Sequence, residues 1–143
     1  MIKPFVLSLA VGLALAPGLA EACSMVGPRN PSLAEQRRSA ETTVDWAVAI
    51  IDGEVVRPFD ETTPALVRAV RVFKGPQQEF FEVGEQTSCD LVLDAAGTRI
   101  RLFLIGGPDV WYAPATLSNP IYEDELLGSD RTEDWPFQWG EAQ

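Results

Sequence analysis

The sequence predicts a mainly β fold, a small closed barrel of five strands accompanied by one short helix. Short apolar segments separated by glycine and proline turns recur along the chain, and one of them, Thr98–Ile105, alternates apolar and charged residues with the period of a strand. A chain of 143 residues with 46% hydrophobic residues is long enough for one core and too short for two full domains. A closed barrel is favoured because it leaves no exposed sheet edges.

The first expected element is a short helix over residues 32–40, "SLAEQRRSA". Ser32 followed three residues later by Glu35 is the pattern of a capping box. The apolar, β-branched run Asp45–Val56 then fits a buried strand. Within this strand Gly53 is expected to mark a bulge or a sharp bend.

The second strand is expected at Ala65–Phe73. Arg68 and Arg71 interrupt its apolar pattern, and their spacing predicts that they lie on opposite faces, so that neither face is wholly buried. A turn at Lys74–Pro76 follows, and Glu79–Val83 is expected as the third strand.

The fourth strand, Thr98–Ile105, has the clearest pattern. Its alternation puts apolar side chains on one face and arginines on the other, namely Ile100, Leu102 and Leu104 against Arg99 and Arg101. The segment Val110–Ala113 follows the turn sequence "GGPD" and is expected to pair with this strand as a hairpin.

The start of the chain has the layout of a secretory signal peptide. Residues 1–22 contain a basic start, an apolar stretch and an A-x-A site ending at Ala22, so we expect export to the periplasm or the exterior and cleavage before Cys23. An uncleaved anchor is the weaker alternative, because the apolar stretch falls short of the roughly 20 residues that span a bilayer. A lipid anchor on Cys23 is also disfavoured, since the charged Glu21 interrupts a lipobox.

Charge and composition exclude several classes of function. The net charge of -10 would repel a phosphate backbone, so we expect no nucleic-acid partner. The chain has no histidine, which removes the usual general base and the commonest zinc ligand. No phosphate-binding glycine loop or calcium loop is found either. We therefore expect no enzymatic activity and no cofactor.

The expected organisation is a signal peptide (1–22), one domain (23–120) and an acidic, aromatic C-terminal tail (121–143). The acids of the tail region are Glu123, Asp124, Glu125, Asp130, Glu133, Asp134 and Glu141, against Arg131 as the single base. The same region contains the aromatic sequence "DWPFQWG". Two alternatives stay open for this tail: it packs onto the barrel, or it is a motif that binds a partner.

Only two cysteines are present, Cys23 and Cys89. An even pair in an exported protein predicts a disulfide, because the compartments outside the cytoplasm permit it. Closing the long loop between them would contribute roughly 4 kcal/mol in the chain-entropy model.

The order of these features resembles the netrin-like OB-fold domain. The resemblance covers about residues 23–120 and rests on a signal peptide ending at a cysteine, a helix, and then "DWAVAIIDGEVV", "VRVFKG", "VGEQTSC" and "GTRIRLFLIGG". Within that group the sequence looks most like bacterial relatives of the N-terminal domain of tissue inhibitors of metalloproteinases. The resemblance implies a five-stranded Greek-key barrel with one or two short helices.

The resemblance also implies an inhibitory edge. In such inhibitors the N-terminal cysteine, held by a disulfide, chelates the zinc of the target protease through its free amine and carbonyl oxygen. The matching positions are Cys23, Ser24 and Met25 at the N-terminus and Thr87, Ser88 and Asp90 beside Cys89. The chain departs from the inhibitors in starting "CSM" rather than Cys-x-Cys and in having one bridge rather than three.

Two functions are therefore expected as alternatives. The first is an exported, non-catalytic OB-fold module that binds a protein or glycan partner through its barrel or its N-terminal edge. The second is a metalloprotease inhibitor, in which Cys23 is the only metal-binding residue and the metal is the zinc of a target endopeptidase.

Overall fold

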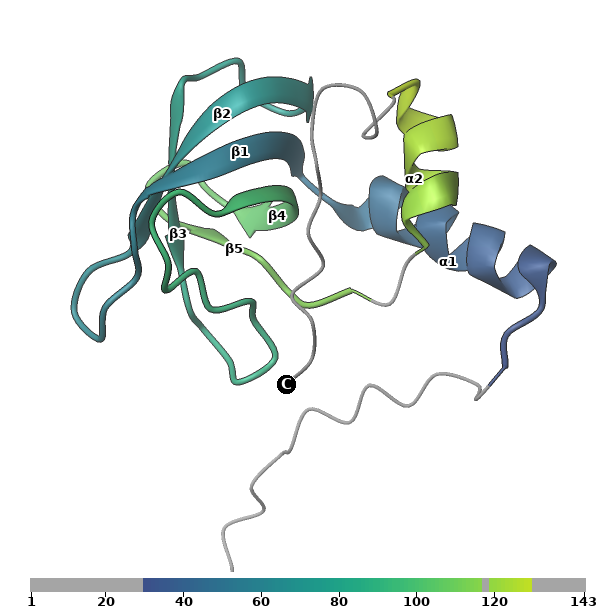
Figure 1. Cartoon of the computed structure of the whole chain (residues 1–143), viewed down its shortest axis with the longest axis horizontal. Helices are drawn as coiled ribbons and strands as arrows, with labels where there is room; N and C mark the ends of the chain where they lie inside the picture. Colours follow the sequence, from purple (N-terminus) through teal and green to yellow (C-terminus); the bar gives the residue numbers. More distant parts are fainter. Residues whose placement is uncertain (1–29, 117–118, 130–143) are drawn as a thin grey trace, which may run out of the picture.

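The computed structural model of the protein describes residues 30–116 and 119–129, which form a barrel of strands flanked by two helices (Figure 1). In chain order the elements are α1 (Leu33–Trp46), β1 (Ala49–Arg57), β2 (Ala65–Lys74), β3 (Phe80–Gly84), β4 (Arg99–Gly106), β5 (Trp111–Tyr112) and α2 (Pro120–Leu127). The predicted signal peptide 1–22, the N-terminal residues Cys23, Ser24 and Met25, and the end of the predicted tail, 130–143, lie outside the described residues.

The five strands close in the order β1-β2-β3-β5-β4, because β1 pairs with β2 along one edge and with β4 along the other. Neighbouring strands are antiparallel, apart from β3 and β5, which run parallel. β5 pairs with the end of β4 through Tyr112 opposite Ile105, as the predicted hairpin requires. The fold class is confirmed: the protein is mainly β, with a closed OB-fold-like barrel of five strands and two helices.

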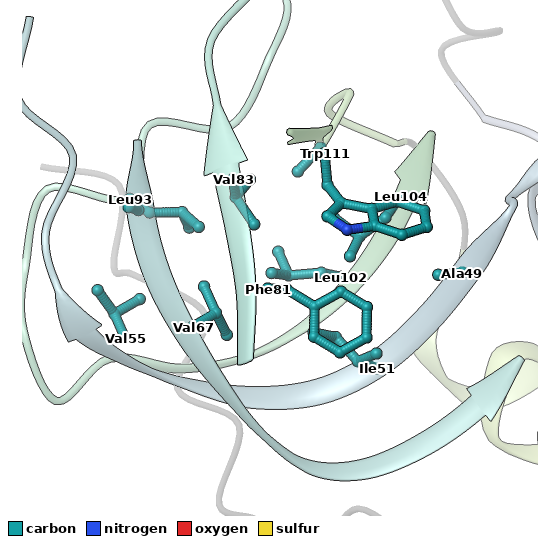
Figure 2. Packing of buried hydrophobic residues seen from close by; sticks show 12 residues of the cluster. Ala49, Ile51, Val55, Val67, Phe81, Val83, Leu93, Leu102, Leu104 and Trp111 are labelled. Atoms are coloured by element: carbon teal, nitrogen blue, oxygen red, sulfur yellow. The ribbon is translucent and has the colours of Figure 1, made fainter. Parts of the chain in front are cut away.

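The core fills the inside of the barrel. The predicted alternation of β4 is confirmed at Leu102 and Leu104, which are fully buried and lie beside Phe81 and Trp111 inside the barrel (Figure 2). The rings of Phe81 and Trp111 lie 5.6 Å apart between centroids with their planes tilted by 57°, a favourable arrangement for aromatic rings. The cluster consists of Ala49, Ile51, Val55, Ala65, Val67, Phe81, Val83, Leu93, Leu102, Leu104, Trp111 and Ala113.

Gly53 lies where the pairing of β1 with β2 changes register, which confirms the predicted bulge or bend. Asp52 is opposite Arg71, whereas Gly53 is opposite Ala69, so β2 has one extra residue at this point. A Cβ atom on Gly53 would lie 2.5 Å from Cγ1 of Val67. Close approach of the two strands therefore requires glycine here.

The same bulge corrects the prediction for the arginines of β2. Ala69 and Val72 pack against the barrel core, while Arg68 and Arg71 are both exposed. The extra residue, Val70, shifts the alternation of the strand by one position. The prediction that the two arginines lie on opposite faces is therefore wrong, because it assumed an unbroken period of two.

Helix α1 begins as predicted and ends later than predicted. The capping box is formed, since the Glu35 amide donates to Ser32 Oγ at 3.3 Å and the Ser32 amide donates to Glu35 Oε2 at 2.8 Å. The Ser32 hydroxyl donates to the same carboxylate oxygen at 2.7 Å, and the hydrogen bonds from the hydroxyl and the amide of Ser32 lower the pKa of Glu35. The helix continues to Trp46, so the start of the predicted strand Asp45–Val56 is wrong.

A contact far along the chain explains the longer helix. Lys74 Nζ, at the end of β2, donates to the carbonyl oxygens of Val44 and Asp45 at 2.9 Å each. A cation that binds the last carbonyl groups of a helix satisfies acceptors that have no partner within the helix. The β-branched residues of the last turns are thus kept helical by tertiary structure.

The two helices cover one end of the outer surface of the barrel. Ala47, Ile50 and Phe103 form a second buried cluster there, with Leu127 of α2 packed against it. Helix α2 begins at Pro120, with Asn119 as its N-cap, and its residue Glu123 is buried. Residues 121–129, expected as the start of a separate tail, therefore belong to the folded body, and the boundary expected after Pro120 falls inside a helix.

We predict that Gly53→Ala destabilises the protein by about 1–3 kcal/mol, because the new methyl group overpacks the contact with Val67. Val67→Ala should cost less in the Gly53→Ala background than in the wild type, since it removes the clashing atom. Urea unfolding of the four proteins measures this coupling. Additive losses would show that the two residues are not in conflict.

Candidate functional site

The loop after β3 is a compact exposed turn, which we call the edge loop (residues 85–90). The carboxylate of Asp90 organises it, since Oδ2 accepts hydrogen bonds from the amides of Gln86 at 2.7 Å and Thr87 at 2.8 Å. The Asp90 amide in turn donates to the carbonyl oxygen of Thr87 at 3.0 Å. The Cys89 amide donates to Thr87 Oγ1 at 3.2 Å. Aspartate side chains favour turns of this kind because they replace backbone hydrogen bonds.

The edge loop is also tied to the chain that follows β5. The Leu91 amide donates to the carbonyl oxygen of Ala113 at 2.7 Å, and the Ala115 amide donates to that of Cys89 at 2.9 Å. Thr87 and Ser88 are exposed at the tip, whereas Cys89 and Asp90 are partly buried. The tip is thus presented to solvent by a backbone that is fixed on both sides.

The structure therefore brings together Thr87, Ser88 and Asp90, three of the six residues predicted for the inhibitory edge. Asp90 acts by positioning the loop rather than by presenting its side chain. Cys23, Ser24 and Met25 lie outside the described residues. No cysteine within the described residues is free, but the bridge from Cys89 to Cys23 stays a prediction, as does binding of a zinc ion by Cys23.

A second feature, which the sequence analysis did not identify, lies on the outer surface of β2, β1 and β4. Asp52 of β1 is opposite Arg71 of β2 and Arg101 of β4, and two residues further along β1 Glu54 is opposite Arg68 and Arg99. Residues paired in this way lie on the same face of a sheet. We call the row Arg71, Asp52 and Arg101 the helix-side rung and the row Arg68, Glu54 and Arg99 the open rung.

The centre of the helix-side rung is a buried ion network. Arg101, with a side chain only 1% exposed, donates to both carboxylate oxygens of Asp52 at 2.6 and 2.8 Å. Its remaining nitrogen donates to Asp124 of α2 at 2.7 Å, and its guanidinium lies 4.6 Å from the ring centroid of Phe73. Burial by itself lowers the pKa of Arg101, but the hydrogen bonds and charges of Asp52 and Asp124 outweigh it and raise that pKa overall.

The open rung has the same composition but is accessible to water. Glu54 accepts from Arg68 at 3.5 Å and lies 3.6 Å from Arg99, whose side chains are about half exposed. Arg71, opposite Asp52 in the neighbouring rung, is exposed as well, so three accessible arginines lie close together on this surface of a chain of net charge -10. The recurrence of arginine in "VRAVRV" and "RIRLF" is the sequence signal that could have indicated this surface.

Within the two described ranges, no three acidic or cysteine side chains gather closely enough to hold a metal ion. None of the described helices is both long and apolar enough to cross a membrane. Comparisons of the chain with protein-family models, with curated proteins and with solved structures found no match. The resemblance to the netrin-like domain therefore stays a prediction from the sequence.

We predict that Asp52→Asn lowers the free energy of unfolding by about 3 kcal/mol, because it removes the negative charge that is paired with the buried guanidinium of Arg101. Glu54→Gln is the matched control, since Glu54 lies on the same strand between two arginines but in the accessible rung. It should cost less than about 1 kcal/mol. Urea unfolding compares the two variants, and equal losses would contradict the assignment of stability to the buried rung.

Proposed function

We propose that the protein is a non-catalytic binding module that acts outside the cytoplasm and holds a protein or glycan partner at the edge loop. The strongest support comes from the Asp90 carboxylate, which accepts hydrogen bonds from the amides of both Gln86 and Thr87. These two hydrogen bonds hold the exposed tip of the loop in one conformation. A loop that is already ordered loses little conformational entropy when it docks. Binding residues are often carried in this way, on loops fixed to a rigid scaffold.

The chemistry of the tip favours a protein partner over a glycan. The hydroxyl-bearing side chains of Thr87 and Ser88 are exposed, and Val92, two residues beyond Asp90, is 53% exposed. Polar groups beside an exposed aliphatic side chain match the mixed surface that non-obligate protein interfaces use. Export is the part of the proposal that rests on the sequence of residues 1–22 alone.

We predict that a photo-crosslinking amino acid at position 88 captures a partner from the extracytoplasmic fraction of the cell. The crosslink should be lost in Asp90→Ala, because the oxygen that accepts from both amides is removed and the tip is no longer held, and kept in Asp60→Ala. Asp60 is the matched control: it holds the Thr62 amide at 2.8 Å in the loop between β1 and β2, and these hydrogen bonds lower its pKa.

Crosslinked products are separated by electrophoresis and identified by mass spectrometry, with a second photo-crosslinking protein substituted at the exposed Glu61 for comparison. The same product from positions 88 and 61, or a product at position 88 that survives Asp90→Ala, would contradict binding at the edge loop.

The second candidate is inhibition of a zinc endopeptidase. It is favoured by the position of the fixed tip, because Thr87, Ser88 and Asp90 are the residues that the resemblance assigns to the inhibitory edge beside Cys89. In this proposal the mature N-terminus at Cys23 provides a free amine and a carbonyl oxygen for the zinc of the protease. A neutral amine is needed for that bond, so inhibition should strengthen as the pH rises through the pKa of the terminal amine.

We predict that one alanine added before Cys23 abolishes inhibition of a panel of zinc endopeptidases, because it displaces the amine from the metal. Folding should be unchanged, since the added residue precedes the whole domain. Inhibition constants at several pH values measure the effect, with the unextended protein as the reference. Equal inhibition by both forms, or none by either, would exclude chelation and leave the binding module as the function.

A further inference from the structure

The described chain ends beside the helix-side rung. Ser129, its last residue, accepts a hydrogen bond from Arg101 at 3.1 Å through Oγ and donates one to Asp124 Oδ1 at 2.9 Å. Residues 130–143 therefore start next to the arginine-bearing surface of β2, β1 and β4. That starting point restricts which part of the barrel they meet first.

The charges of this segment and of that surface are opposite. Residues 130–143 contain four acids and one base, a net charge of -3, together with Trp135, Phe137 and Trp139. The surface presents Arg68 and Arg99 on either side of Glu54, with the exposed Arg71 next to them opposite Asp52. Arginine pairs with carboxylates and also stacks on aromatic rings, so one surface suits both kinds of side chain in the segment.

Apolar side chains lie next to these arginines. Phe80 of β3 is opposite Arg68 and is 44% exposed, and Val70, the bulged residue between Arg68 and Arg71, is 61% exposed. Large aromatic side chains gain by covering such groups, because apolar area is removed from water.

We propose that residues 130–143 bind back onto the open rung of their own chain and the strand surface beside it. The acids of the segment pair with Arg68 and Arg99, and its aromatic side chains cover the arginines and the exposed Val70 and Phe80. This is an intramolecular interaction surface on the outer face of β1, β2 and β4, extended by Phe80 at the start of β3, and it does not depend on the function proposed for the edge loop.

Geometry and tethering both permit the contact. Fourteen extended residues span up to roughly 45 Å, whereas the two rungs are two residues apart on β1, about 7 Å. A segment tethered this closely has an effective concentration on the order of millimolar at its site. Exposed ion pairs that would be weak between separate molecules are sufficient under these conditions.

The test uses the full chain labelled with 5-fluorotryptophan, whose four tryptophans give four fluorine resonances. In the wild type, the resonances of Trp135 and Trp139 should be shifted away from the position of free 5-fluorotryptophan. In Arg68→Gln/Arg99→Gln they should move to that position, and so should those of the wild type in about 1 M salt, which shortens the screening length to roughly 3 Å. The resonance of the buried Trp111 should stay unchanged and so report an intact barrel.

Arg37→Gln/Arg57→Gln is the matched control. It removes the same charge from two exposed arginines, one on α1 and one paired with Glu82 at the far end of β1. Here the Trp135 and Trp139 resonances should stay as in the wild type.

Three outcomes would overturn the proposal. Resonances of Trp135 and Trp139 at the free position in the wild type would mean that the segment does not bind the barrel. Shifted resonances that ignore Arg68→Gln/Arg99→Gln would place it on another surface. Shifts that disappear on dilution would show that the segment binds a second copy of the chain.

Discussion

The buried charge of Arg101 is the constraint on which the arrangement of the barrel and the helices depends. An arginine with a side chain 1% exposed requires carboxylates within hydrogen-bonding distance, because an unpaired buried charge is strongly unfavourable. Asp52 on the neighbouring strand provides one carboxylate, and Asp124 on α2 provides the other. Strand pairing does not fix the position of α2, so this ion pair helps to orient the helix. The network thus specifies where α2 lies on the barrel, while the apolar contacts of Leu127 and Phe103 supply the burial beneath it.

The outer surface of β1 and β4 changes character along its length. Next to the helices it is apolar at Ile50 and Phe103, then ionic and buried at Asp52, and finally ionic and accessible at Glu54. Side chains on one face of the sheet thus contribute differently to stability, depending on whether the helices cover them. The sequence pattern indicates a polar face, but half of that face is buried and half is accessible to water.

The limits of prediction follow from the same physics. The strands and the capping box were predictable because alternation and capping are local patterns, and Leu102 with Leu104 shows the pattern at its simplest. The pattern does not reveal the bulge at Val70, so it predicts Arg68 and Arg71 on opposite faces, whereas both lie on the outer face. The end of α1 depends on Lys74, a residue about thirty positions away, and the burial of Arg101 depends on α2, which no local pattern could reveal.

In the edge loop, Thr87, Ser88 and Asp90 were indicated by a family resemblance, and the role of Asp90 is evident only from its hydrogen bonds.

The bond between Lys74 and the end of α1 has a consequence for how the chain folds. It joins residues 30 and 29 positions apart, whereas the ion pair between Arg101 and Asp52 joins residues 49 positions apart. Closing a shorter loop costs less conformational entropy, and contacts between nearby residues form sooner on average. The helix and the first two strands therefore make a unit that is able to assemble during synthesis, before β4 has been made. When the barrel closes, β4 pairs with β1, and Arg101 of β4 then meets Asp52 on a strand that is already in place.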